Sequence, residues 1–337
     1  MRQLFLCLPC KAPSDPDYEG CKGGIEEEYK MKKILTVSSS PHIRHEDTTQ
    51  GIMLDVIIAL LPAAIFGCCI FGLKAVFVLL TTTAVAVLAE FLWNLILKKP
   101  QSIGDLSAVV TGLLLGMNLP PSTPLWMAAI GSIAAIIVVK QMFGGLGFNF
   151  ANPAITARII LLVSFSSRIT TFIEPISHTT SSATPLAMES GAVSLKNLFL
   201  GMHAGCIGET SAFLLIIGGL ALIARKVIKP IIPLCFIGSF AVCTAIAGEN
   251  VLVQLLTGGL LLGAIFMATD YVTSPTTNLG KMVFGIGCGV LTFVIRHFAN
   301  LPEGVSYAIL LMNILTPHIN TLTLRKPFGM KEGKQNG

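Results

Sequence analysis

Charged residues are scarce in this sequence. Lys, Arg, Asp and Glu make up 12% of the chain, hydrophobic residues make up 53%, and the mean hydropathy is +0.76. A soluble domain has about 25% charged residues, because its surface must be hydrated. The composition therefore argues against a soluble enzyme or binding domain. The net charge of +5 requires no nucleic-acid partner, because the basic residues lie in short segments between apolar runs.

Cysteines with the spacing of a metal site are also missing. Cys7, Cys10 and Cys21 lie in the polar first thirty residues, and no His precedes His42. A closed zinc or iron–sulfur site needs four ligands. The other six cysteines lie in or near apolar segments without ligand spacing, as small buried hydrophobic residues do. We therefore expect no metal site.

Residues 1–30 lack the basic, apolar and small-residue order of a signal peptide. Glu26-Glu27-Glu28 requires purine-only codons shortly before Met31, and a translated ribosome-binding site would have this form. We therefore expect that translation starts at Met31 and that the polar N-terminal extension is a mis-assigned start. The intact mass of the native protein tests this expectation.

Long charge-free apolar runs are present instead, at Val56–Leu73 and Leu106–Val139. A run of about 18 or more apolar residues spans roughly 30 Å of hydrocarbon as a helix. The sequence therefore predicts an all-α integral membrane protein with about ten transmembrane helices. The predicted helices are 52–72, 75–97, 105–119, 125–142, 153–166, 208–225, 230–247, 251–269, 281–297 and 304–322.

Basic residues predict the orientation, because cytoplasmic loops carry the excess of Lys and Arg. With the N-terminus in the cytoplasm, the inner segments hold fourteen basic residues, namely Lys32, Lys33, Arg44, Lys98, Lys99, Lys140, Arg225, Lys226, Lys229, Lys281, Arg325, Lys326, Lys331 and Lys334. The outer segments hold Lys74, Arg168, Lys196 and Arg296. Both termini are therefore predicted to be cytoplasmic.

A weak internal repeat indicates the architecture. Thr111–Gly116 (TGLLLG) in the third predicted helix resembles Thr257–Gly263 (TGGLLLG) in the eighth, and a turn rich in Pro, Ser and Thr follows each. Similarly, Asp55 begins the first predicted helix and Glu209 begins the sixth. Two five-helix halves have opposite orientations, because five is odd, so the prediction is two inverted repeats with a site where the broken third and eighth helices meet. The predicted parts are a cytoplasmic segment 31–51, a first repeat 52–166, an extracytoplasmic loop 167–207, a second repeat 208–322 and a cytoplasmic tail 323–337.

The longest predicted connection, Ser167–Ile207, contains the sequence HTTSSATPL from His178 to Leu186. Long loops of this kind are often functional. Ser181–Leu186 (SSATPL) resembles the flavin-attachment motif of the D subunit of Rnf complexes, and resembles less closely that of the B subunit of the sodium-pumping NADH:quinone reductase. The resemblance extends from Met31 to about Phe328. Other segments that carry it are Leu35–Arg44, Met53–Pro62 and Phe266–Pro275.

The resemblance implies FMN attached through its phosphate to Thr184 by a flavin transferase. Ser181, Ser182 and Ala183 are small neighbours that let the loop enter the transferase. The family often has Gly at the position of Ser182 and an acidic residue at that of His178. A second, noncovalent flavin such as riboflavin is also implied among the helices.

The same resemblance implies a function in electron and ion transport. The chain would be the flavin-carrying subunit of an Rnf-type complex that couples ferredoxin:NAD⁺ electron transfer to Na⁺ or H⁺ translocation. It would be one part of an ion-translocating oxidoreductase and would not be active alone. Its partners would be the other subunits, the flavin transferase and the lipid of a bacterial cytoplasmic membrane, with the flavin loop on the outer face. This sequence has no NAD fingerprint and no iron–sulfur cysteine set, so those steps would belong to other subunits.

Several ionisable residues fall in the apolar segments, where charge is expensive and indicates function. Glu90, Asp55 and Asp270 are the candidates for an ion path. Glu90 lies well inside the second predicted helix, and Asp270 ends the broken eighth, where carboxylate and carbonyl oxygens suit Na⁺. For Asp55, and for Asp105 and Glu209, helix capping is the alternative.

Other candidates have structural alternatives as well. Arg158 is expected to pair with an acid in the bundle. Asn149 and Asn152 precede the fifth helix, where they would either face a flavin or partner subunit or start the helix.

Two other functions stay open on the sequence. One is the B-type subunit of the sodium-pumping quinone reductase. The other is a non-redox channel or transporter for small solutes, because inverted repeats with broken helices also build such proteins. Flavin content distinguishes the redox carrier from the channel.

Overall fold

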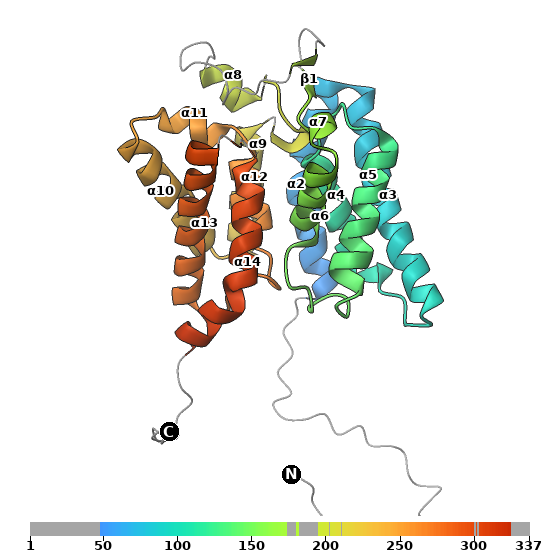
Figure 1. The fold of residues 1–337 in the computed structure, drawn as a ribbon. Coiled ribbons are helices and arrows are strands. Elements are labelled where there is room, and N and C mark those ends of the chain that lie inside the picture. The colour runs from blue at the N-terminus through green and yellow to red at the C-terminus, as the bar shows by residue number, and fades with distance from the viewer. Residues whose placement is uncertain are drawn as a thin grey trace, which may run out of the picture. The chain divides into compact units, whose positions relative to one another are not determined.

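The computed structural model describes residues 48–173, 180–181, 195–201, 203–209, 211–299, 301 and 303–324. The chain divides into the units Met1–Glu46 and Asp47–Gly337, and all described residues lie in the second unit. Helices make up most of that unit (Figure 1). The predictions for residues 1–47 therefore lie outside the described residues.

The first half of the described unit contains the elements expected from the apolar runs. They are α2 (Thr49–Phe71), α3 (Leu73–Ile96), the 3₁₀ turn η1 (Ile103–Asp105), α4 (Ser107–Met117), α5 (Leu125–Ile133) continued by the π-helix η2 (Ala134–Gln141), α6 (Pro153–Ser164) and α7 (Ser166–Ile169). Asn152 caps α6 by accepting from the Ala154 N–H at 3.0 Å, and Pro153 needs no N–H partner at the first helical position.

The connection to the second half contains short elements. They are the strands β1 (Phe172–Ile173) and β2 (Thr180–Ser181), the helix α8 (Leu195–Leu200) and the 3₁₀ turn η3 (Ile207–Glu209). The strands form an antiparallel ladder in which Phe172 pairs with Ser181. Figure 1 shows β1 and α8 at the same end of the unit.

The second half repeats the pattern of long and short helices. Its elements are α9 (Ala212–Ala224), α10 (Ile231–Ile246), α11 (Val251–Leu256), α12 (Leu260–Leu262) continued by the π-helix η4 (Gly263–Met267), α13 (Asn278–Ala299) and α14 (Gly304–Thr323). Figure 1 shows α10–α14 beside α2–α7.

Short segments occupy the centre of the unit. Nine of the eleven residues of α4 are buried, and so are all residues of α12 and η4. The helix α4 ends just before Pro120-Pro121, because proline cannot donate the next backbone hydrogen bond. The eighth predicted helix breaks at Gly258 and Gly259, whose φ values of 68° and 65° favour glycine.

The helices identify an integral membrane protein. Among the described residues, α2, α3 and α13 are long and apolar enough to cross a bilayer, and α4, α5–η2, α6, α9 and α10 are shorter apolar helices. Leu80 and Leu92 of α3 are 61% and 51% exposed, as expected for side chains that face lipid. The count of ten spans and the inverted repeat stay predictions.

Three placements differ from the predictions. The sixth helix begins at Ala212 and not at 208, because Ser211 caps it by accepting from Leu214 N–H at 3.3 Å. Glu209 therefore lies in η3 and does not begin a helix. Lys140 and Arg296, which the orientation count treats as charges outside the membrane, lie within their predicted helices, in η2 and α13, and are buried.

Candidate functional site

The structure describes only the edge of the predicted flavin motif. Ser181 is the last residue of β2, so the motif follows directly after the β1–β2 ladder. Ser182, Ala183 and Thr184 lie outside the described residues, as does His178. The predicted attachment of FMN therefore stays a prediction.

Glu90 lies at the centre of the first buried polar cluster, which we call the Glu90 cluster. Its members are Glu90, Asn94, Ser102, Ser107, Lys140 and Gln141. The Lys140 ammonium donates to both Glu90 carboxylate oxygens, at 3.0 and 2.8 Å, and to Ser107 Oγ at 2.7 Å. Glu90 also accepts from Ser102 Oγ at 2.6 Å and from Gln141 Nε2 at 3.0 Å.

This arrangement compensates two charges that are each only 1% exposed. Lys140 uses all three of its N–H donors. The π-helical turn brings the neighbours Lys140 and Gln141 to the same carboxylate, and such turns are frequent at functional sites. The cluster ties together α3, the start of α4 and the end of η2.

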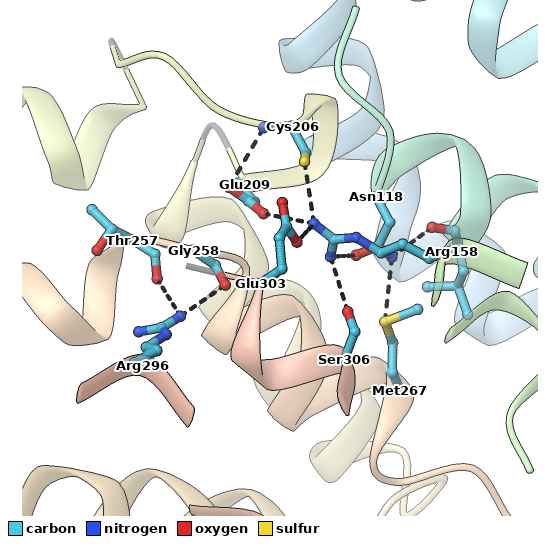
Figure 2. Close-up of polar contacts among 11 residues, drawn as sticks. Asn118, Arg158, Cys206, Glu209, Thr257, Gly258, Met267, Arg296, Glu303 and Ser306 are labelled. Carbon is cyan, nitrogen blue, oxygen red and sulfur yellow. Dashed lines mark hydrogen bonds and ion pairs between the residues drawn. The ribbon is translucent and has the colours of Figure 1, made fainter. Parts of the chain in front are cut away.

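Arg158 forms the second buried cluster, which we call the Arg158 cluster (Figure 2). Its members are Asn118, Arg158, Cys206, Glu209, Glu303 and Ser306. The guanidinium donates to Asn118 Oδ1 at 2.7 Å and to Glu303, and lies 3.7 Å from Glu209 Oε1. Arg158 is 2% exposed, so its charge depends on these two carboxylates.

The Arg158 cluster joins the two halves of the unit. Arg158 comes from α6, whereas Glu303 and Ser306 come from the start of α14. Asn118, just after α4, donates to the Met267 sulfur at 3.3 Å, and Asn152 donates to the Met267 carbonyl at 3.1 Å. The ends of the two broken segments therefore meet, as the repeat predicted.

A second buried arginine, Arg296, binds backbone carbonyls at the break in the eighth predicted helix. Arg296 donates to the carbonyls of Thr257 and Gly258 at 3.1 and 2.8 Å (Figure 2). It also donates to the Gln254 carbonyl at 2.8 Å. These carbonyls have no helical N–H partner where α11 ends. At Gly259 a Cβ would lie 2.7 Å from Glu209 Oε1, so a side chain there would collide with the carboxylate.

A cavity lies between the two halves. Its volume is about 80 Å³, and Lys140, Ser107, Asn149, Asn152 and Asp270 line it together with apolar side chains. That volume holds several water molecules. The buried Asn149 Oδ1 has no hydrogen-bond partner among the described residues. The cavity therefore joins the predicted residue Asp270 to the Glu90 cluster.

Asp55 is not part of this cavity. Its carboxylate pairs with Arg225 at 3.1 Å, between α2 and the end of α9, and the Arg225 side chain is 64% exposed. The cap of α2 is instead Thr48, which accepts from the Gly51 N–H at 3.1 Å. The capping alternative for Asp55 is therefore wrong.

His203 is a buried polar residue that the sequence did not indicate. It is 5% exposed, and neither ring nitrogen has a hydrogen-bond partner among the described residues. Burial lowers the pKa of His203, although the nearby Glu209 opposes this shift. The folded protein therefore holds His203 as the neutral imidazole.

This pKa predicts a loss of stability in acid. The folded state disfavours the imidazolium, so stability is full above the unfolded pKa of 6.5 and declines as the pH falls below it. We expect His203→Phe to flatten this decline, measured as the thermal midpoint in detergent between about pH 5 and 8. Parallel pH profiles for wild type and variant would contradict the prediction.

The sequence predicted some of these residues and missed others. Arg158 pairs with acids, as expected, and the Glu90 side chain is buried within a helix whose other face is exposed. Glu303 was missed because it stands between predicted helices, and Lys140 was counted as a loop charge. Among the described residues no group of three His, Cys, Asp or Glu is placed to hold a metal ion.

Comparison with known proteins gives a consistent result. Residues 36–329 match the model of the NQR2, RnfD, RnfE family. The D subunit of the Na⁺-translocating ferredoxin:NAD⁺ oxidoreductase complex of Acetobacterium woodii is 45% identical, over 89% of this chain and 97% of the relative. The D subunit of the proton-translocating complex of Clostridium ljungdahlii is 41% identical, over 89% of this chain and 98% of the relative.

Proposed function

Because this chain belongs to the NQR2, RnfD, RnfE family, we propose that it is the D subunit of an ion-translocating ferredoxin:NAD⁺ oxidoreductase complex. The observation that carries the proposal is 45% identity over nearly the whole length of the corresponding protein of such a complex. Both relatives belong to ferredoxin:NAD⁺ complexes, which favours this function over the quinone reductase. The other subunits of the complex are its partners.

The flavin carrier is Thr184 in this proposal. Its hydroxyl is esterified with the FMN phosphate by a flavin transferase, and Ser181, Ser182 and Ala183 keep the site accessible. The bound flavin supplies one-electron redox chemistry. The β1–β2 ladder anchors the chain three residues before Thr184, so the tether keeps the flavin close to the membrane surface.

The inverted repeat is supported by a matching pair of basic residues. Lys140, at the end of α5–η2, donates to Ser107 at the start of α4. Arg296, near the end of α13, donates to Thr257 and Gly258 just before α12. In each half, a cation on the fourth helix therefore contacts the start of the short third segment, which supports the proposal of two inverted five-helix repeats.

The same repeat gives the proposed topology of ten spans in a bacterial cytoplasmic membrane. Both termini are cytoplasmic and the flavin loop is on the outer face. Lys140 was counted on the inner side and Arg296 on the outer side, and both are buried. Leaving both out of the count does not change the excess of basic residues on the inner side.

The cavity beside Asp270 is the proposed entrance for the ion. Asp270 and Asn149 supply the oxygen ligands that Na⁺ prefers, and Asn149 Oδ1 lacks a partner among the described residues. The Glu90 carboxylate is paired with the Lys140 ammonium, so in this proposal Glu90 contacts the ion only when that salt bridge opens. Asp55 would lie outside this path, at the Arg225 pair.

A second, noncovalent flavin fits the chemistry of this cavity but not its size. Apolar walls with a few polar groups are typical of cofactor sites. About 80 Å³ is less than the roughly 300 Å³ at which such pockets begin. We therefore assign no step to a second flavin in this form of the protein.

Fluorescence of the denatured protein tests the carrier role. Expressed with the transferase, the wild-type band is expected to fluoresce on a denaturing gel, and the Thr184→Ala band to be dark. Ser181→Ala is the matched control, because it removes a neighbouring hydroxyl and should keep the flavin. A dark wild-type band, beside a flavinylated control protein, would refute the carrier role and favour a channel.

A further inference from the structure

A deep apolar groove opens on the side of the second half. Its volume is about 530 Å³, and it lies between α9, α10, α11 and the α12–η4 segment. Only apolar residues line it, including Ile216, Ile223, Leu234, Leu256 and Ile265. In a membrane protein, such a groove is filled by hydrocarbon or by another apolar segment.

The dimensions favour hydrocarbon chains. Along α9 the lining extends from Ile216 to Ile223, which is about 10 Å at 1.5 Å per residue. The groove has room for extended acyl chains over that length, and the charge at its end argues for a lipid and not for a partner helix.

Positive charge gathers at one end of the groove. Ile223 and Pro230 line that end, and the turn between them carries Lys226 and Lys229, both exposed. Lys281, in the first turn of α13, lies close enough to Lys229 for their charges to repel.

No carboxylate of the residues that the structure describes neutralises these lysines. Arg225, in the same turn, pairs with Asp55, but none of Lys226, Lys229 and Lys281 forms an ion pair with a described residue. Within the described part of the chain, Lys229 donates to the neutral Asn278 Oδ1, at 3.3 Å. Two repelling ammonium groups beside an apolar groove match a ligand with an anionic head and apolar chains.

We propose that this groove and the three lysines bind an anionic phospholipid. Its acyl chains lie along α9 and α10, and its phosphate contacts Lys226, Lys229 and Lys281. Basic pockets between membrane helices recognise anionic headgroups in this way. Because Leu261 and Ile265 also line the groove, the chains pack against the back of the broken α12–η4 segment and support it.

Native mass spectrometry of the protein in mild detergent, with added phosphatidylglycerol or phosphatidylcholine, tests the proposal. Lys229→Gln/Lys281→Gln removes two charges at the groove. Lys98→Gln/Lys99→Gln, between α3 and η1, removes two exposed charges elsewhere and is the control. We expect wild type and control to retain one phosphatidylglycerol per chain, and the groove variant to bind it at least tenfold more weakly.

A second variant tests the apolar part of the site. Leu234→Trp fills the groove from its exposed rim, and should release the lipid while all lysines remain. Unchanged thermal midpoints in phosphatidylcholine would show that both variants fold. Equal binding of phosphatidylcholine by wild type, or wild-type affinity for phosphatidylglycerol in either groove variant, would overturn the proposal.

Discussion

Replacing Glu90 with glutamine is expected to lower the free energy of unfolding by about 3–5 kcal/mol. The carboxylate accepts four hydrogen bonds, two of them from the Lys140 ammonium, and both side chains are 1% exposed. Glutamine keeps the shape but leaves an uncompensated buried charge on Lys140. Unfolding in mixed detergent micelles measures the loss.

A double variant separates this charge effect from other effects. Lys140→Met alone should also destabilise, because it leaves Glu90 buried without its cation. Glu90→Gln/Lys140→Met should recover much of the loss, because neither charge remains. Lys99→Gln, at an exposed position, is the control and should stay within about 0.5 kcal/mol of wild type. Additive losses in the double variant would contradict the ion-pair interpretation.

The sequence predicted the helices better than their ends. Apolar runs of sufficient length give α2, α3 and α13, because a helix that crosses hydrocarbon needs about 20 predominantly apolar residues. Pro120 marked the end of the third helix, because proline cannot donate the next backbone hydrogen bond. The position of the break in the eighth predicted helix, at Gly258 and Gly259, was missed, because it falls inside the span predicted for that helix. The prediction for the start of α9 is wrong because it rests on Glu209 as the acid that begins the helix, whereas Ser211 provides the actual cap.

The clusters were harder to predict than the helices. The orientation rule counts basic residues near helix ends as charges outside the membrane, so the sequence did not indicate that Lys140 and Arg296 are buried in ion pairs or backbone contacts. Both are buried because the partners come from distant segments: Glu90 lies 50 residues from Lys140, and Gly258 lies 38 residues from Arg296. Pairing over such separations depends on how the helices pack, which one sequence does not contain.

Arg158→Met is expected to have the largest effect of any single substitution in the second cluster. It would leave the Glu303 and Glu209 carboxylates, both buried, without the guanidinium that contacts them. Breaking a buried pair in this way costs about 3–5 kcal/mol, and here two carboxylates lose the same partner. We therefore expect a low yield of folded protein by size-exclusion chromatography in detergent.

Conservative variants show whether the low yield of folded protein comes from the lost charge or from the lost shape of the Arg158 side chain. Arg158→Lys keeps the charge but cannot make the forked contacts to Asn118 and Glu303 at once, so it should fall between wild type and Arg158→Met. Adding Glu303→Gln to Arg158→Met should restore part of the folded yield, because it removes one uncompensated carboxylate. If Arg158→Met folds as well as wild type, the cluster does not hold the halves together. If Glu303→Gln fails to help, the loss comes from packing and not from buried charge.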